Sequence, residues 1–256
     1  LAKDGVLVGE PPKLWFCRDT NGDGVADDKT LIASDYGDGV NPEHQANGLL
    51  YNLDNWYYNA DYEKRFRYDG GKWLTDVVLD RGQWGISQDN FGRLFYNYNS
   101  DHLRAAIVPP QYVARNPYYR GARANEQLAE DQFVWPEHET AVNRGYRAGF
   151  VREDGTLRKF TATCAPEIYR GGIFPPSFEG NAFVCEPSAN VIRRDIITER
   201  DGRLKAANAY KESEFIASSY ERFRPVNLYT GPDGALYVID MHHGLLQHKV
   251  YLTPYL

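Results

Sequence analysis

A short unit recurs along this chain and constrains its fold more than any other feature. Each copy is an acidic or polar turn, then a Gly or Asn, then a short strand such as "GALYVID" or "GRLFYNYN". The Gly or Asn stands at positions 5, 55, 92, 180 and 234, with intervals of 50, 37, 88 and 54 residues. Periods of about 40 to 50 residues are typical of four-stranded propeller blades. The sequence therefore predicts an all-β propeller with five recognisable blades.

The amino-acid composition agrees with strands separated by turns. The 256 residues include 19 Tyr, 12 Phe and 5 Trp beside 23 Gly and 14 Pro, and aromatic residues favour strands whereas Gly and Pro favour turns. A chain of this length can form one large β domain, so we expect a single propeller domain over residues 1–256.

The 88-residue interval is too long for one blade and holds either a further blade or an insertion. Its middle, 109–143, is rich in Pro, Arg, Glu and Tyr and alternates weakly. We therefore predict an irregular insertion there, with a short helix around 122–131.

The two ends of the sequence differ in how they fit the repeat. The first unit begins at its turn, whereas the last is followed by the β-rich segment "LLQHKVYL". Either a strand from one end completes a blade begun by the other, or the sequence is a piece of a longer protein. We favour the second interpretation.

Charge and cysteine content exclude some classes of function. The formal net charge of −6 offers no basic surface for nucleic acid, and no apolar run reaches the ~20 residues of a membrane span. The three cysteines, Cys17, Cys164 and Cys185, form no metal-binding CxxC pair. A disulfide between Cys164 and Cys185 and three buried free thiols both remain open.

The segment "DTNGDGVADD" predicts a calcium loop in a β-hairpin. Calcium binds six to eight oxygens, and Gly24 permits a sharp bend among alternating acidic and amide side chains. Thr30 stands where a full EF-hand loop has its last acidic ligand, so the loop looks more like the nine-residue loops of integrin-type propellers. The expected ligands are Asp19, Asn21, Asp23, the Val25 carbonyl and Asp27.

Candidate chemistry lies just before the repeated turns, because inner propeller strands line a central channel. Three such segments contain His44, Arg81 and Arg224. A histidine can accept the proton of an alcohol as hydride leaves, and arginines bind carboxylates of a cofactor. Polar or aromatic neighbours that would help to hold the cofactor are Gln83, Trp84 and Asn227, with Asn47 beside His44.

Four long segments carry a resemblance to a known family. They are "HQANGLLYNLDNWYYNA", "RGQWGISQDNFGRLFYNYNSDHL", "FEGNAFVCEPSANVI" and "ERFRPVNLYTGPDGALYVIDMHHGLLQHKVYLTPYL". Together they resemble the propeller of very large bacterial proteins that is named for an inferred membrane-bound dehydrogenase activity. Those proteins often carry a c-type haem domain. More remotely, the chain is similar to glucose/sorbosone dehydrogenases, which are six-bladed propellers that use pyrroloquinoline quinone with calcium.

The resemblance implies an extracytoplasmic, six-bladed propeller that oxidises a sugar or alcohol and passes electrons to a haem partner. By position, His44 resembles the base of the quinone enzymes, and Arg81 and Arg224 resemble their cofactor-binding arginines. The sequence has no CxxCH motif, so a c-type haem would belong to a partner domain or protein.

Two alternative functions stay open. One is a calcium-stabilised propeller without catalytic activity, which binds a glycan or a protein through aromatic residues; these are Trp56, Tyr57, Tyr58 and Trp84. The other is a lactonase-like hydrolase, whose channel metal would need converging carboxylates. The candidates are Glu43, Asp54, Glu186 and Asp240. Because adjacent strand residues face opposite sides, His242 and His243 are poorly placed to share one metal, whereas Asp240 and His242 share a side.

Overall fold

The computed structural model describes residues 3–119, 122–139 and 147–245. Almost all of its regular structure is β-strand, in five antiparallel sheets that follow one another along the chain. This confirms the predicted all-β class, and the five sheets match the five units of the sequence.

The sheets contain two to five strands each. The first consists of β1 (Val6–Glu10), β2 (Lys13–Arg18) and β3 (Asp28–Ala33), and the second of β4 (Asn47–Tyr51), β5 (Tyr57–Ala60), β6 (Lys64–Asp69) and β7 (Lys72–Val77). The third contains β8 (Ile86–Gln88), β9 (Leu94–Tyr98), β10 (Asp101–Ala106) and β11 (Glu126–Gln127). The fourth contains β12 (Cys164–Ile168), β13 (Ala182–Glu186), β14 (Val191–Arg200), β15 (Arg203–Asn208) and β16 (Ile216–Ala217), and the fifth β17 (Pro225–Thr230) and β18 (Leu236–Asp240).

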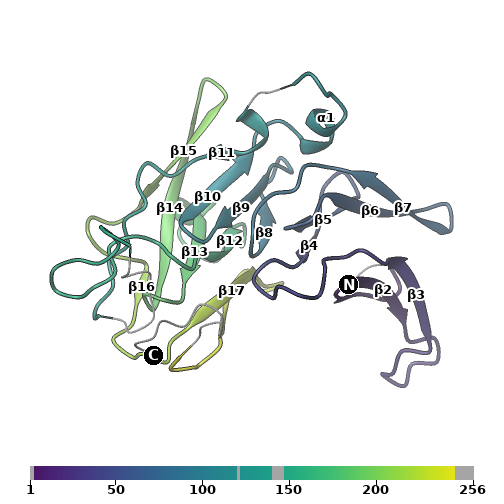
Figure 1. Ribbon diagram of the computed structural model, residues 1–256, viewed down its shortest axis with the longest axis horizontal. Helices are drawn as coiled ribbons and strands as arrows, with labels where there is room; N and C mark the ends of the chain where they lie inside the picture. Colours follow the sequence, from purple (N-terminus) through teal and green to yellow (C-terminus); the bar gives the residue numbers. More distant parts are fainter. Residues whose placement is uncertain (1–2, 120–121, 140–146, 246–256) are drawn as a thin grey trace.

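The sheets are arranged like the blades of a propeller. In Figure 1 they fan out from a centre near β4, β8, β12 and β17, and β12 contacts both β8 and β17. Hydrophobic clusters lie between successive sheets, as blade-on-blade packing requires. No sheet combines strands from both ends of the described chain, so the described residues form an open β-propeller of five sheets.

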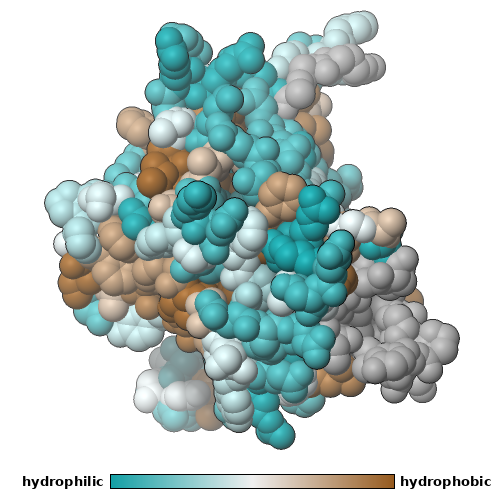
Figure 2. All heavy atoms as spheres, turned by 90° about the vertical axis from the view of Figure 1, so that its left-hand side faces the viewer, coloured by the Kyte–Doolittle hydropathy of each residue, from teal (hydrophilic) through white to brown (hydrophobic). Residues whose placement is uncertain are grey.

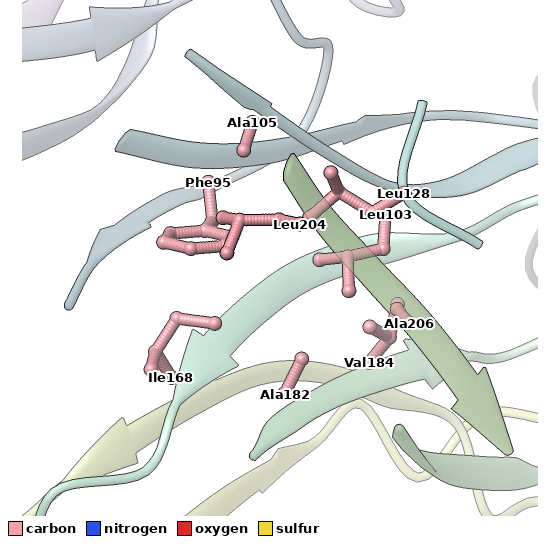
Figure 3. Packing of buried hydrophobic residues seen from close by; sticks show 9 residues of the cluster. All are labelled: Phe95, Leu103, Ala105, Leu128, Ile168, Ala182, Val184, Leu204 and Ala206. Atoms are coloured by element: carbon pink, nitrogen blue, oxygen red, sulfur yellow. The ribbon is translucent and has the colours of Figure 1, made fainter. Parts of the chain in front are cut away.

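The core between the third and fourth sheets illustrates this packing. Phe95 of β9 and Leu103 of β10 face Val184 of β13 and Leu204 of β15 (Figure 3). Leu128 joins them from the segment after β11, and all five are at most 4% exposed. Each inter-blade cluster therefore depends on strands that lie far apart in the sequence.

The turns before the second strands have the expected backbone conformation in four of the five units. Asn55 has φ of 64°, and Gly92, Gly180 and Gly234 have φ of 74°, 73° and 82°. These values lie in the left-handed region that Gly and Asn tolerate best. Gly5 is the exception, since its φ lies outside the left-handed region; there a side chain would collide with the backbone carbonyl of Cys17.

The insertion differs from the prediction in its helix. The expected helix around 122–131 is wrong: only the three-residue 3₁₀ turn η1 (Ala122–Ala124) forms there, and β11 follows it. The backbone of Leu128 then bonds to that of both Leu103 and Ala206, so pairing with two sheets outweighs local helix propensity. The helices α1 (Pro110–Ala114) and η2 (Pro176–Phe178) complete the regular structure.

Three further features are the segment near the C-terminal end of the sequence, the length of the helices, and the distribution of hydrophobic side chains on the surface. The segment "LLQHKVYL" lies outside the described residues apart from Leu245. No described helix is long and apolar enough to cross a membrane. Hydrophilic side chains cover most of the face shown in Figure 2, with hydrophobic ones gathered mainly toward one edge.

Candidate functional site

Two adjoining cavities lie at the centre of the propeller. The first, which we call the mouth cavity, has a volume of ≈ 490 Å³ and is lined by Pro42, Glu43, Trp84, Asn99, Ala162, Cys164, Pro187, Ser188, Arg224, Val226 and Met241. The second, the channel cavity, has ≈ 530 Å³ and is lined by 47–51, 84–86, 165–167 and 226–229 on β4, β8, β12 and β17 or directly before them. Trp84 and Val226 line both cavities, so the two are neighbours along one channel.

Trp84 is held in place by its neighbours on the second and fourth sheets. Its carbonyl accepts a hydrogen bond of 2.8 Å from the backbone N–H of Ala165. On either side, Asn47 donates to the carbonyl of Gln83 at 2.6 Å and accepts from the N–H of Gly85 at 2.8 Å. Gly85 has φ of 86°, a conformation that suits glycine. The backbone at Trp84 is therefore fixed, and its side chain packs against the core between the fourth and fifth sheets and lines both cavities.

Glu167 on β12 is the channel carboxylate that sequence reasoning missed. Its Oε1 accepts hydrogen bonds from the Thr230 hydroxyl at 2.7 Å and the Thr230 N–H at 3.1 Å. Burial raises the pKa of Glu167, although the bonds from Thr230 oppose that rise. A carboxyl group with a raised pKa in a cavity is a candidate for proton transfer. No motif marks this glutamate, because β12 does not carry the repeated turn.

Arg224 lies where the sequence places it, on the wall of the mouth cavity. Its guanidinium donates to three backbone carbonyls, those of Pro187, Gly244 and His243, at 2.6, 2.7 and 3.1 Å. It is 2% exposed, and burial lowers its pKa. The side chain thus ties the turn after β13 to the segment that follows β18.

Arg81 and Gln83 lie near the channel but line neither cavity. Arg81 is 2% exposed and donates to the carbonyl of Leu79, while its Nε and Nη1 have no hydrogen-bond partner among the described residues. Gln83 donates to the carbonyl of Glu43 at 3.2 Å and accepts from the N–H of Asn99 at 3.3 Å. Asn227, in contrast, lines the channel cavity and donates to the Tyr229 hydroxyl at 2.9 Å.

His44 is exposed beside the mouth cavity. Its side chain is 53% exposed, and its Nδ1 lies 3.4 Å from Oδ2 of Asp61. Burial and the nearby Asp80 raise the pKa of Asp61, whereas His44 lowers it. His44 does not line either cavity. The structure therefore brings Trp84, Arg224 and Asn227 to the channel and places His44, Arg81 and Gln83 around it.

The four carboxylates of the lactonase alternative have separate surroundings. Glu186 is fully buried and accepts from the N–H groups of Thr161, Ala162 and Ser188. Asp54 pairs with Arg65 at 3.0 Å, and Asp240 accepts from the N–H groups of Arg224 and His242. Glu43 lines the mouth cavity. In the described part of the chain no three His, Cys, Asp or Glu side chains are placed to hold a metal ion.

The predicted calcium loop does connect two paired strands, β2 and β3. Its oxygens are engaged within the loop: Asp19 accepts from the N–H groups of Gly22 and Gly24 at 2.6 and 2.8 Å, and Asp23 accepts from Val25 at 2.8 Å. Asp27 accepts from Asn21 at 3.1 Å. The donor types suit calcium, but the carboxylates do not converge in this arrangement. Calcium binding therefore stays a prediction.

The aromatic residues of the glycan alternative also differ in accessibility. Tyr58 is 3% exposed, and Trp56 lies under the guanidinium groups of Arg65 and Arg67, whose carbons are 4.2 and 5.0 Å from its ring centroid. Trp84 is the member of the set that opens into the channel.

Cys164 and Cys185 are direct partners on the neighbouring strands β12 and β13, as their sequence spacing suggested. Both are buried, and both thiols are free in this structure. The disulfide is therefore not formed here.

Fold and site together define a class: an open β-propeller with a cavity-lined channel between its inner strands. The chain belongs to the family described as Domain of unknown function (DUF7133), whose model matches residues 1–256. A search of curated proteins found no match.

Two solved structures show similarity to the chain. One is virginiamycin B lyase from Staphylococcus aureus, with 11% identity, a TM-score of 0.38, and coverage of 91% of this chain and 62% of the lyase chain. The other, from Thermus thermophilus, is named as a candidate oxidoreductase (glucose dehydrogenase), with 15% identity, a TM-score of 0.39, and coverage of 91% and 86%. This chain thus spans less than two thirds of the lyase chain.

Proposed function

We propose that this domain binds a sugar or alcohol in the channel beside Trp84 and serves in an extracytoplasmic oxidoreductase. The observation that carries the proposal is the shared indole wall between two cavities, with Glu167 close to it in the channel cavity. An aromatic wall packs against the apolar face of a sugar ring, while amide and carboxyl groups bind its hydroxyls. A c-type cytochrome is the proposed electron acceptor.

Glu167 is the proposed proton acceptor, with His44 as the alternative. Oxidation of an alcohol moves a hydride to an acceptor and a proton to a base, and a base in the channel is better placed than one at the surface. Because the pKa of Glu167 is raised, the fraction in the basic form, and with it the rate, rises with pH through that pKa.

Pyrroloquinoline quinone is the redox cofactor that the family resemblance suggests. Of the residues predicted to hold it, Trp84 offers a ring to stack on, but the two arginines do not fit a carboxylate clamp as they stand. Arg81 is closed off from both cavities, and Arg224 donates to three carbonyls. We therefore derive no step through the quinone.

The test is a dye-reduction assay of the domain with a panel of sugars and alcohols, run with and without pyrroloquinoline quinone and calcium. We expect turnover that falls at least tenfold in Glu167→Gln, while Glu212→Gln, an exposed control, keeps wild-type kcat. If turnover fell by a comparable factor in His44→Gln and not in Glu167→Gln, His44 would be the base. Absence of both turnover and sugar binding across the panel would contradict the proposal, whereas binding without turnover would favour the non-catalytic alternative.

A further inference from the structure

A third pocket lies at the end of the second sheet, away from the residues that line the mouth cavity. We call it the Tyr68 pocket; it has ≈ 610 Å³ and is lined by Lys3, Tyr51, Asn55, Tyr57, Arg67, Tyr68 and Asp69. Among these residues only Tyr51 also lines the channel cavity, and none lines the mouth cavity. The pocket plays no part in the proposed function.

The strand pairing explains why the pocket opens there. β5 and β6 pair at Tyr57 and Phe66, and β6 runs on through Asp69 while the chain before Tyr57 turns away toward β4. Asn55, with φ of 64°, makes that turn, and its Oδ1 accepts from the Tyr51 hydroxyl at 2.7 Å. A gap therefore forms between the β4–β5 turn and the end of β6.

Aromatic rings form the apolar part of the pocket. The centroids of Tyr51 and Tyr57 lie 4.8 Å apart, Tyr57 lies 5.9 Å from Trp73, and Trp73 lies 5.4 Å from Tyr68. These contacts hold the tyrosines as a connected group. Rigid tyrosine rings bury a large area at a small entropic cost, and their hydroxyls still bond to a polar ligand.

Two cations and one carboxylate supply the charge. The Lys3 amino group lies 4.2 Å from the Tyr68 ring centroid, and Arg67 Nη2 donates to Asp69 at 3.2 Å. Arg67 Nε is buried and has no hydrogen-bond partner among the described residues. The pocket therefore has one excess positive charge in a chain of net charge −6.

From these features we propose that the Tyr68 pocket binds an acidic sugar. The sugar ring packs against the tyrosines, and its anionic group accepts hydrogen bonds from Arg67 and Lys3. A guanidinium recognises a planar carboxylate with two N–H groups, and it also binds sulfate. The recognised chemistry is thus an anionic carbohydrate, whose charge comes from a carboxylate or a sulfate.

The experiment compares three polymers in affinity electrophoresis: polygalacturonate, dextran sulfate and neutral dextran. We expect the protein to be retarded by at least one anionic polymer and not by dextran; the two anionic arms separate carboxylate from sulfate. Tyr68→Ala and Arg67→Met should each weaken this retardation at least fivefold. The matched controls Tyr112→Ala, on α1, and Arg200→Met, in the β14–β15 hairpin, should match wild type, since both side chains are exposed.

Several outcomes would overturn the inference. Equal retardation by all three polymers, or by none, would exclude an acidic-sugar site. If Arg67→Met weakened the retardation and Tyr68→Ala did not, the polymers would bind through surface charge alone, and no sugar ring would pack against Tyr68. Circular dichroism spectra and melting temperatures show whether each variant is folded. Trp84→Ala should keep wild-type retardation, because Trp84 does not line the Tyr68 pocket. The acidic-sugar proposal and the channel proposal can therefore fail independently of each other.

Discussion

At the scale of single residues, some side chains that the sequence suggested as cofactor-binding groups are buried and bond to the protein itself. Arg224 was predicted as a cofactor anchor because an arginine fork suits carboxylates, yet backbone carbonyls occupy its donors. The residue type and its place beside the channel were predictable. Its partners were not, because they come from Pro187, His243 and Gly244, which no local pattern brings together.

Replacement of Arg224 tests this structural role. Arg224→Met removes three hydrogen bonds and leaves buried carbonyls without a donor, so we expect the free energy of unfolding to fall by about 3 kcal/mol. Arg200→Met, whose side chain is 94% exposed, should change it by less than about 0.5 kcal/mol. Urea unfolding at pH 7 measures both. An unchanged free energy of unfolding in Arg224→Met would show that these three hydrogen bonds do not stabilise the fold.

A second buried group, Asp195, makes stability depend on pH. The Nε2 of His102 lies 2.7 Å from its Oδ2, and Arg193 lies 3.7 Å from its Oδ1. Burial raises the pKa of Asp195, but His102 and Arg193 outweigh burial, and the pKa lies below its usual value. A lowered pKa adds stability that is complete above the unfolded pKa of about 3.9 and is lost as pH falls through the folded value.

The variant Asp195→Asn isolates that contribution. We expect a loss of about 3 kcal/mol at pH 7, because the change leaves His102 buried without its carboxylate partner, while Arg193 keeps its pair with Glu214. The stability difference between wild type and variant should shrink below about pH 4, because the unfolded chain binds a proton there more readily than folded Asp195 does, and the difference is lost as pH falls through the lowered folded pKa. Unfolding curves from pH 7 down to pH 3 provide the measurement. A difference independent of pH would mean that Asp195 does not carry the charge.

At the scale of elements, the turns, the hairpins and the place of the insertion were predictable, and the structure inside the insertion was not. The β2–β3 hairpin and four of the five positive-φ turn positions follow from Gly, Asn and Asp spacing alone. The helix expected around 122–131 failed because Glu126 and Gln127 pair with β10, a partner distant in sequence. Local propensity governs a segment only where no neighbouring sheet offers its edge.

The β2–β3 loop carries the calcium prediction. If the loop binds calcium, millimolar calcium should raise the melting temperature relative to chelator, since a ligand that binds only the folded state stabilises it. Asp23→Asn should abolish that rise, because it removes one anionic ligand and keeps an oxygen to accept from Val25. Asp201→Asn, with an exposed side chain in the β14–β15 turn, is the control. Identical melting with calcium and with chelator would refute the site.

At the scale of the whole molecule, the channel exists because inner strands of different blades approach closely. A Cβ added to Gly85 would lie 2.7 Å from the Cα of Ala165 on β12. The sequence predicted the propeller and put Trp84 and Asn227 near the channel, since the repeat gives inner strands a fixed place. It did not reveal Glu167, because which side chains face one cavity depends on how the blades pack.

Gly85→Ala tests this close approach against a control with matched backbone geometry. Gly85 has φ of 86°, and Gly202 has φ of 67° but no atom within 4 Å of an added Cβ. Both changes cost about 1 kcal/mol of backbone strain. Only Gly85→Ala should lose about 2 kcal/mol more, through the clash with Ala165. Chemical denaturation of the two variants gives the difference, and equal losses would place the two strands farther apart.

The most direct test of the channel as the ligand site is a calorimetric titration of wild type, Trp84→Ala and Trp15→Ala with glucose, galactose, xylose and glycerol. Trp15 lies on β2, outside both cavities. We predict binding of at least one of these compounds, with a Kd raised about tenfold or more in Trp84→Ala, equivalent to about 1.4 kcal/mol, and unchanged in Trp15→Ala. Equal affinity in wild type and Trp84→Ala, or no binding of any compound by wild type, would contradict the account.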